Sequence, residues 1–256
     1  MARGNHFWIA ALAVGAMAGS GCARFPTTGI AEFTRLSFRI RMAGGINDSL
    51  DSTPLTQYIY VIAIRVLTTD DTPPQGAPVP VVAGNSPNGF VAGSPTHWVE
   101  YNSSRPSQPL ILYKFNPGPT PGDPTNPINL SSWFDTSPSR GRIINYTLPN
   151  AGDPRELRFD LFANQLVDSD VQTATIRRLQ VNVLTMNRLA TSGGSRVWDA
   201  IGNSLNPVDL NSFLTVDLRV NGVVDNRFSI EPTADTVGGD DPDLDLVDFS
   251  IEVQRP

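Results

Sequence analysis

The densest group of side chains capable of chemistry lies near the C-terminus. Residues 228–254 include eight acidic residues and no basic residue. Asp241, Asp243 and Asp245 occupy alternate positions, as the hard oxygen ligands of calcium often do in loops. Glu252 follows eleven residues after the first of them. Because repulsion among so many carboxylates favours a bound cation, this spacing predicts a calcium site formed by these four residues.

The same acidic stretch has a second interpretation. An EF-hand loop has a similar ligand spacing, but its sharp turn requires a Gly where this chain has Leu246. The residues that follow alternate between apolar and polar, which is typical of a strand. The acidic side chains would then form the solvated polar face of an edge strand, where they discourage aggregation. The sequence leaves both interpretations open.

Side chains suited to catalysis are sparse. Once the first 21 residues are removed, His97 is the only histidine, and a Ser-His-Asp arrangement would have to use it. The chain has no Gly-x-Ser-x-Gly motif, no His-x-x-x-His pair and no phosphate-binding Gly-rich loop before a helix. We therefore expect His97 to be a structural residue at a strand edge and the protein to be non-catalytic. A hydrolase with paired carboxylates is the third of our functional hypotheses.

Three tryptophans, Trp98, Trp133 and Trp198, carry the second hypothesis. Their rings could stack on sugars and make the protein a glycan-binding module. The same residues also suit the core of a β-sandwich, which buries tryptophan readily. The glycan hypothesis requires at least one of these rings to lie exposed in a groove.

The composition excludes several classes of partner and site. The chain of 256 residues has 25 acidic and 19 basic side chains, for a net charge of −6. Such a chain is poorly suited to neutralising phosphates, so nucleic acid is not an expected partner. Charged residues form 17% of the chain, against about 25% in a typical domain, which suits a secreted protein. The single cysteine, Cys22, rules out an internal disulfide and a multi-cysteine zinc site.

The N-terminus has the pattern of a bacterial secretory signal. Arg3 lies in a short polar start, residues 7–18 are apolar, and small residues precede Cys22. The twelve apolar residues would rise only about 18 Å as a helix, too little to cross a hydrocarbon core of about 30 Å. Gly21-Cys22 resembles the lipobox of bacterial lipoproteins, in which the cysteine is diacylated and becomes the first residue.

The resemblance implies a signal peptide over residues 1–21, a lipid on Cys22 and a tether over residues 22–33. Several acyl chains together anchor a protein stably to a membrane. Ala23 follows the cysteine. In this family, a residue other than Asp at this position implies export to the outer membrane. A conventional cut after Ala18 would instead leave Cys22 as a free thiol.

Strands are the elements that we expect to position these residues. Alternation predicts a half-buried strand over 36–42, with arginines on its outer face either solvated or paired across strands. A nearly continuous apolar run predicts a central strand over 58–67. Asn221-Gly222 predicts a two-residue hairpin turn. Further strands are predicted at His97–Tyr101, Leu110–Phe115, Arg142–Leu148, Leu157–Ala163, Leu179–Met186, Leu214–Val220, Val223–Ile230 and Asp248–Val253. With no sustained helical period, the chain is expected to be all-β, an antiparallel β-sandwich.

A possible internal repeat bears on domain organisation. The segment 36–40 recurs as 157–161, and Ile64-Arg-Val-Leu-Thr recurs as Val181-Asn-Val-Leu-Thr in the same order. Trp98 and Trp198 form a further matched pair. The repeat predicts either two similar Ig-like sandwiches, over 34–154 and 155–256, or one pseudo-symmetric sandwich built from both halves.

We conclude from the sequence that this is a lipid-anchored protein of the bacterial cell envelope with a structural or protein-binding role. Its expected partners are the membrane, through the lipid, and an envelope protein or polysaccharide. Calcium is the only cofactor that the residues suggest.

Overall fold

The computed structural model describes residues 34–46, 58–80, 91–101, 109–114, 143, 145–149, 152–167, 175–186, 197–206, 209, 212–228, 230–237 and 240–256. The predicted signal peptide, Cys22, the tether and Trp133 lie outside the described residues.

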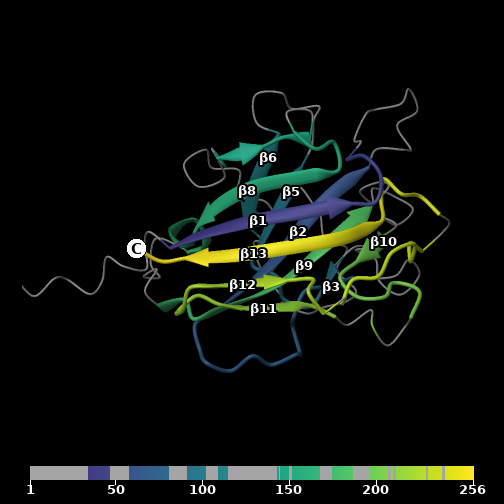
Figure 1. Ribbon diagram of the computed structural model, residues 1–256. Coiled ribbons are helices and arrows are strands. Elements are labelled where there is room, and N and C mark those ends of the chain that lie inside the picture. The colour runs from purple at the N-terminus through teal and green to yellow at the C-terminus, as the bar shows by residue number, and fades with distance from the viewer. Residues whose placement is uncertain are drawn as a thin grey trace, which may run out of the picture.

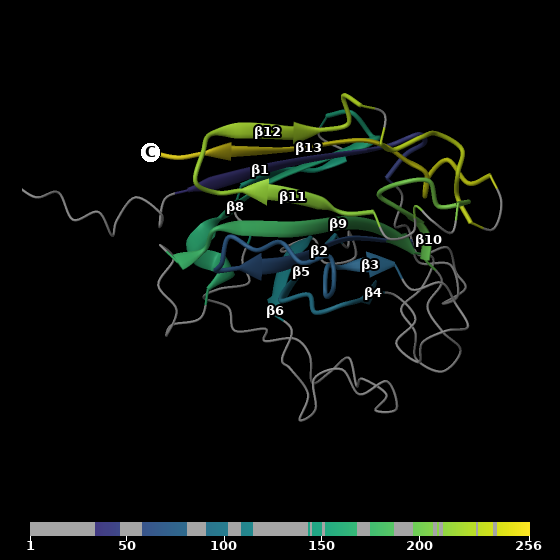
Figure 2. The same ribbon diagram turned by 90° about the horizontal axis from the view of Figure 1, so that it is seen from below.

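The described residues form two antiparallel sheets packed as a β-sandwich, which confirms the predicted fold class (Figures 1 and 2). In sheet order, the five-stranded sheet contains β12 (Gly222–Asp225), β13 (Leu246–Gln254), β1 (Arg35–Met42), β8 (Glu156–Phe162) and β7 (Tyr146–Thr147). The six-stranded sheet contains β10 (Val197–Ala200), β9 (Arg178–Met186), β2 (Ile59–Leu67), β5 (His97–Tyr101) and β6 (Leu110–Lys114), with β11 (Leu214–Asp217) also paired to β9. A small ribbon pairs β3 (Val79–Pro80) with β4 (Val91–Ala92), and a 3-10 helix, η3 (Ala163–Leu166), follows β8.

The main core lies between the two sheets. Alternate residues of β1 are buried, as the period-2 pattern predicts, while its arginines lie on the outer face. Six consecutive residues from the start of β2 are buried, because a second apolar cluster containing Trp98 and Leu184 covers the outer face of the six-stranded sheet. The prediction that β2 is a central strand covered on both sides is confirmed.

The matched segments of the repeat lie side by side. In the five-stranded sheet, Phe38 of β1 is opposite Phe159 of β8, and Leu36 is opposite Leu161. The two phenylalanine rings stack with centroids 4.8 Å apart and planes inclined by 4°. Leu36 therefore faces Leu161, which is the repeat counterpart of Ile40, and Ile40 faces Leu157, the counterpart of Leu36. A local twofold axis through the Phe38–Phe159 pair produces this arrangement.

The six-stranded sheet has the same symmetry. Ile64 of β2 lies opposite its matched residue, Val181 of β9. Strands on either side of the 154/155 boundary therefore pair with each other in both sheets, which fits one pseudo-symmetric sandwich rather than two separate ones. Trp98 and Trp198 do not correspond in this arrangement. Trp98 lies on β5 and Trp198 lies on β10, but the strand that takes the place of β5 beside β9 is β11.

The predicted hairpin at Asn221-Gly222 is wrong. β11 pairs with β9 and β12 pairs with β13, so the chain crosses from one sheet to the other at this point. A type I′ turn needs positive φ at both central residues, and neither is among the described residues with positive φ. The Asn221 side chain instead accepts a hydrogen bond from the backbone of Arg255, 2.8 Å away.

Candidate functional site

The first two acids of the predicted calcium site, which precede β13, accept hydrogen bonds from residues next to β1 and β2. Asp241 accepts a hydrogen bond of 2.6 Å from the Tyr58 hydroxyl, and this bond, with burial, raises the pKa of Tyr58 to about 12. Asp243 accepts a hydrogen bond of 2.8 Å from the backbone N–H of Gly45. The neighbouring Gly44 packs so closely on this turn that a Cβ there would lie 2.3 Å from an Asp243 carboxylate oxygen. Both carboxylates therefore have structural partners.

The other two acids point to different surroundings. Both oxygens of Asp245 accept from the backbone N–H of Ala234, at 3.1 and 3.0 Å. Glu252 accepts from the amide of Gln254, at 2.7 Å on β13. No metal-sized group of three acidic side chains among the described residues contains any of the four predicted ligands.

A different set of acids does converge. Asp199, at the end of β10, meets Glu231 and Asp235 of the segment before β13, and one carboxylate oxygen from each lies within 4.8 Å of the others. These side chains are 0%, 3% and 3% exposed. Both figures show β10 and the chain that enters β13 at the same end of the sandwich (Figures 1 and 2). The sequence pattern singled out this acidic tail but gave no signal for Asp199.

Asp199 is held by three hydrogen-bond donors. One oxygen accepts from the backbone N–H of Ala200 at 2.9 Å and from the Ser204 hydroxyl at 2.7 Å. The other accepts from the backbone N–H of Leu246 at 2.7 Å. Because Leu246 begins β13, this carboxylate joins the ends of strands from both sheets.

Backbone donors also fix the other two members of the group. Glu231 accepts from Gly202 N–H at 2.7 Å, and Asp235 accepts from Ser204 N–H at 2.7 Å. Gly202 has a φ of +100°, and a Cβ there would lie 2.7 Å from Ser212, so this position suits only glycine. The turn after β10 is thus shaped to present its N–H groups to the carboxylates.

Burial and mutual repulsion perturb these acids strongly. Removal from water, followed by the charge of Asp235, raises the pKa of Asp199 well above its usual range. Burial and the charge of Asp199 raise the pKa of Glu231 to about 11. Burial likewise raises the pKa values of Asp235 and Asp245. The surroundings thus disfavour the charged form of all four carboxyls.

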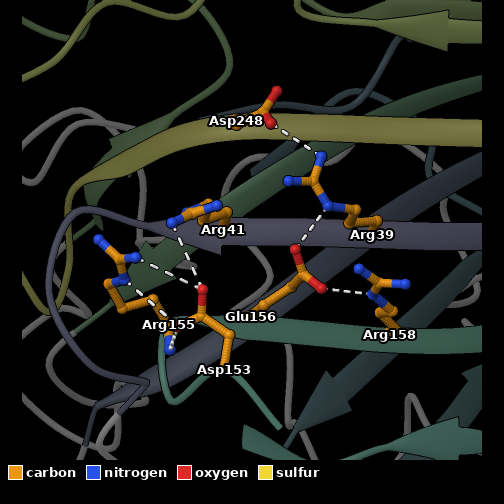
Figure 3. Close-up of polar contacts among 7 residues, drawn as sticks. All are labelled: Arg39, Arg41, Asp153, Arg155, Glu156, Arg158 and Asp248. Atoms are coloured by element: carbon orange, nitrogen blue, oxygen red, sulfur yellow. Dashed lines mark hydrogen bonds and ion pairs between the residues drawn. The ribbon is translucent and has the colours of Figure 1, made fainter.

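The outer face of the five-stranded sheet has the opposite character. Figure 3 shows a ladder of ion pairs across β13, β1 and β8. Arg39 lies 2.5 Å from Glu156 and 2.8 Å from Asp248, and Arg158 also pairs with Glu156. Burial acts to raise the pKa of Glu156, but hydrogen bonds from Arg158 and Arg39 outweigh it and hold the pKa below its usual value. The arginines of β1 are thus paired across strands, one of the two predicted outcomes.

The ladder continues at the end of β1. Asp153 accepts hydrogen bonds from the backbone and side chain of Arg155, at 3.0 and 3.3 Å, and lies 3.4 Å from Arg41. The bonds from Arg155, the backbone bond first, lower the pKa of Asp153. We refer to the seven residues of Figure 3 as the charge ladder: Arg39, Arg41, Asp153, Arg155, Glu156, Arg158 and Asp248.

Neither of the two tryptophans that the structure describes is fully exposed. Trp98 is fully buried in the outer cluster of the six-stranded sheet, where no sugar could reach it. Trp198 is partly buried on β10. A shallow hollow of about 370 Å³ on the outer face of the five-stranded sheet contains Tyr146, Arg35 and Arg158 but no tryptophan.

His97 is buried on β5, where its Nδ1 lies 2.9 Å from the Thr96 hydroxyl. This environment suits the structural role predicted for it.

Most of the exposed large apolar side chains in the described part of the chain lie on the edge strand β12 or near it in the sequence. Of the five large apolar residues that are exposed in the described part of the chain, four fall between residues 220 and 230. Phe228 is 80% exposed and Val223, on the strand itself, is 47% exposed. β12 ends the five-stranded sheet, so its outer edge has no strand neighbour within that sheet. The other two residues are Val220 and Ile230.

Comparison with known proteins gives no relative: no family model, curated protein or solved structure matches this chain. None of the helices in the described ranges is long and apolar enough to cross a membrane.

Proposed function

We propose that this chain is a non-catalytic structural protein of the bacterial cell envelope, anchored by a lipid on Cys22, which contacts another protein through edge strand β12. The carrying observation is that four exposed large apolar side chains lie on this edge strand or within five residues of it along the chain. An edge strand offers unpaired N–H and C=O groups to a further strand, and apolar side chains beside them add contact area. The occupant that fits is an extended protein segment with apolar side chains.

The anchor rests on the N-terminal sequence. Cys22→Ala should move the protein from the membrane fraction into the soluble fraction, and mass spectrometry of the wild type should show the acyl chains. If the variant still partitions with membranes and the wild type has no acyl mass, the lipoprotein assignment is wrong.

The contact through β12 is tested by site-specific photo-crosslinking in intact cells. A crosslinker at Val223 should give a discrete protein adduct, because this side chain is exposed on the open edge. The matched control is Thr215, which is exposed on β11 of the other sheet. Absence of an adduct at Val223, or equal labelling at Thr215, would contradict the proposal.

The glycan-binding alternative retains only Trp198 among the described tryptophans. It would be favoured over a protein-binding role if the protein were retained on cell-wall polysaccharide and Trp198→Ala abolished that retention without changing stability.

A further inference from the structure

The buried acids Asp199, Glu231 and Asp235 form no ion pair with the arginines that the structure describes. No ion pair between described residues includes any of them. Asp245 adds a fourth negative group beside them, and its charge acts on Glu231. A cluster of buried carboxylates needs either protons or a cation.

The hydrogen bonds of the cluster favour ionised carboxylates. Backbone N–H groups of Gly202, Ser204 and Leu246 donate to the three acids, as does the Ser204 hydroxyl. A neutral carboxyl would instead have to donate its own proton to an acceptor. Each of these groups donates a hydrogen bond to a carboxylate oxygen. The hydrogen bonds of the cluster therefore favour its negatively charged form.

Two carboxylate oxygens have no such donor. Within the described part of the chain, Glu231 Oε1 and Asp235 Oδ1 are buried and have no hydrogen-bond partner. Buried polar atoms in folded proteins almost always have a partner, which can be an ion. The side chains that carry these two oxygens belong to the group that lies within 4.8 Å.

We propose that Asp199, Glu231 and Asp235 bind one calcium ion. Calcium takes carboxylate oxygens at about 2.3–2.6 Å, so ligands on opposite sides of the ion lie about 5 Å apart. Three oxygens within 4.8 Å of one another can therefore all reach one ion. The absence of His and Cys from the group disfavours zinc and copper, which prefer softer ligands.

The proposed site differs from the one that the sequence spacing predicts. Asp241 and Asp243 bind Tyr58 and the turn at Gly45. The calcium ion would instead join the end of β10 to the 231–237 segment, next to the first residue of β13.

Calcium titration of the full chain, followed by thermal unfolding, tests the site. Protein stripped with EDTA is melted in calcium chloride, in magnesium chloride and in sodium chloride at matched ionic strength. An ion that binds only the folded state, at a hundredfold its Kd, should raise the midpoint by roughly 5–10 °C in a chain of this size. Isothermal titration calorimetry should give one calcium per chain.

Two variants locate the ion. Glu231→Gln retains an oxygen for the Gly202 N–H and should fold, but should lose the calcium response. Asp243→Asn removes the same charge from the same acidic tail and should keep the response. The calcium-free midpoint of each variant shows whether it is folded.

Four results would overturn the proposal. Equal stabilisation by sodium chloride would show charge screening only. A full calcium response in Glu231→Gln would place the ion elsewhere, and its loss in Asp243→Asn alone would place it at the acids of the sequence pattern. A magnesium response equal to that of calcium would contradict the assignment to calcium.

Discussion

Two regions of this protein are rich in carboxylates and use them in opposite ways. On the charge ladder, Asp153 and Glu156 lie beside arginines, and their pKa values are lowered. At the end of β10, Asp199 and Glu231 lie among N–H donors and other carboxylates, and their pKa values are raised. Both regions contain Asp and Glu side chains. The charge of the neighbouring groups and the access of water therefore decide whether the pKa of a carboxyl is lowered or raised.

The two regions should also differ in energetic weight. The ladder lies on an outer sheet face, where the arginine side chains are 29% to 59% exposed and water can solvate one whose partner is removed, so each ion pair contributes little. The cluster is buried, so an uncompensated charge or an orphaned N–H has no replacement from solvent. The contrast can be tested by matched substitutions.

The largest effect is expected at Asp199 in buffer that contains calcium. Asp199→Ala should lower the free energy of unfolding by about 3–5 kcal/mol, because the Leu246 N–H loses its acceptor and the proposed ion loses a ligand. Glu156→Ala, the matched change on the ladder, should cost about 1 kcal/mol or less. Urea unfolding of both variants measures the difference. Equal losses at the two sites would break the comparison.

A change of sign is expected when calcium is removed. Glu231→Gln should then stabilise the protein by about 1 kcal/mol, because a neutral amide replaces a buried carboxyl that must either keep its charge or take up a proton on folding. The same Glu→Gln exchange at Glu156 should destabilise it slightly, since two arginines lose a partner. Denaturant midpoints in EDTA compare the two. Destabilisation by Glu231→Gln would show that the Glu231 carboxyl stabilises the folded protein without calcium.

The smallest effect concerns acid stability. Because the pKa of Glu156 in the folded state is below its ordinary value of 4.5, its contribution is present above that pH and is lost as the pH falls through the lower folded value. Wild type should therefore exceed Glu156→Gln by about 1 kcal/mol or less near neutrality, and the two should converge in acid. Unfolding curves at several pH values measure the gap. A gap that widened on acidification would contradict the paired role of Glu156.

The sequence by itself determined the all-β architecture, because period-2 burial is a local property of a strand. The alternation over 36–42 and the apolar run over 58–67 correspond to β1 and β2. The matched segments of the repeat are neighbouring strands in the structure, with Phe38 opposite Phe159 and Ile64 opposite Val181. The short strand β10 was missed, since its four residues are too few to show a period. The N-terminal pattern indicated a lipid anchor, which stays a prediction.

Only the tertiary structure decided which strands and acids meet. Asn221-Gly222 has the local chemistry of a hairpin, yet pairing with β9 and β13 draws the flanking strands into different sheets. The alternate spacing of Asp241 and Asp243 predicted calcium ligands, but in the fold these side chains accept hydrogen bonds from Tyr58 and Gly45. Asp199 joins Glu231 and Asp235 because β10 ends beside the chain that enters β13. Contacts between residues so distant in sequence depend on the packing of whole sheets, and no local spacing encodes them.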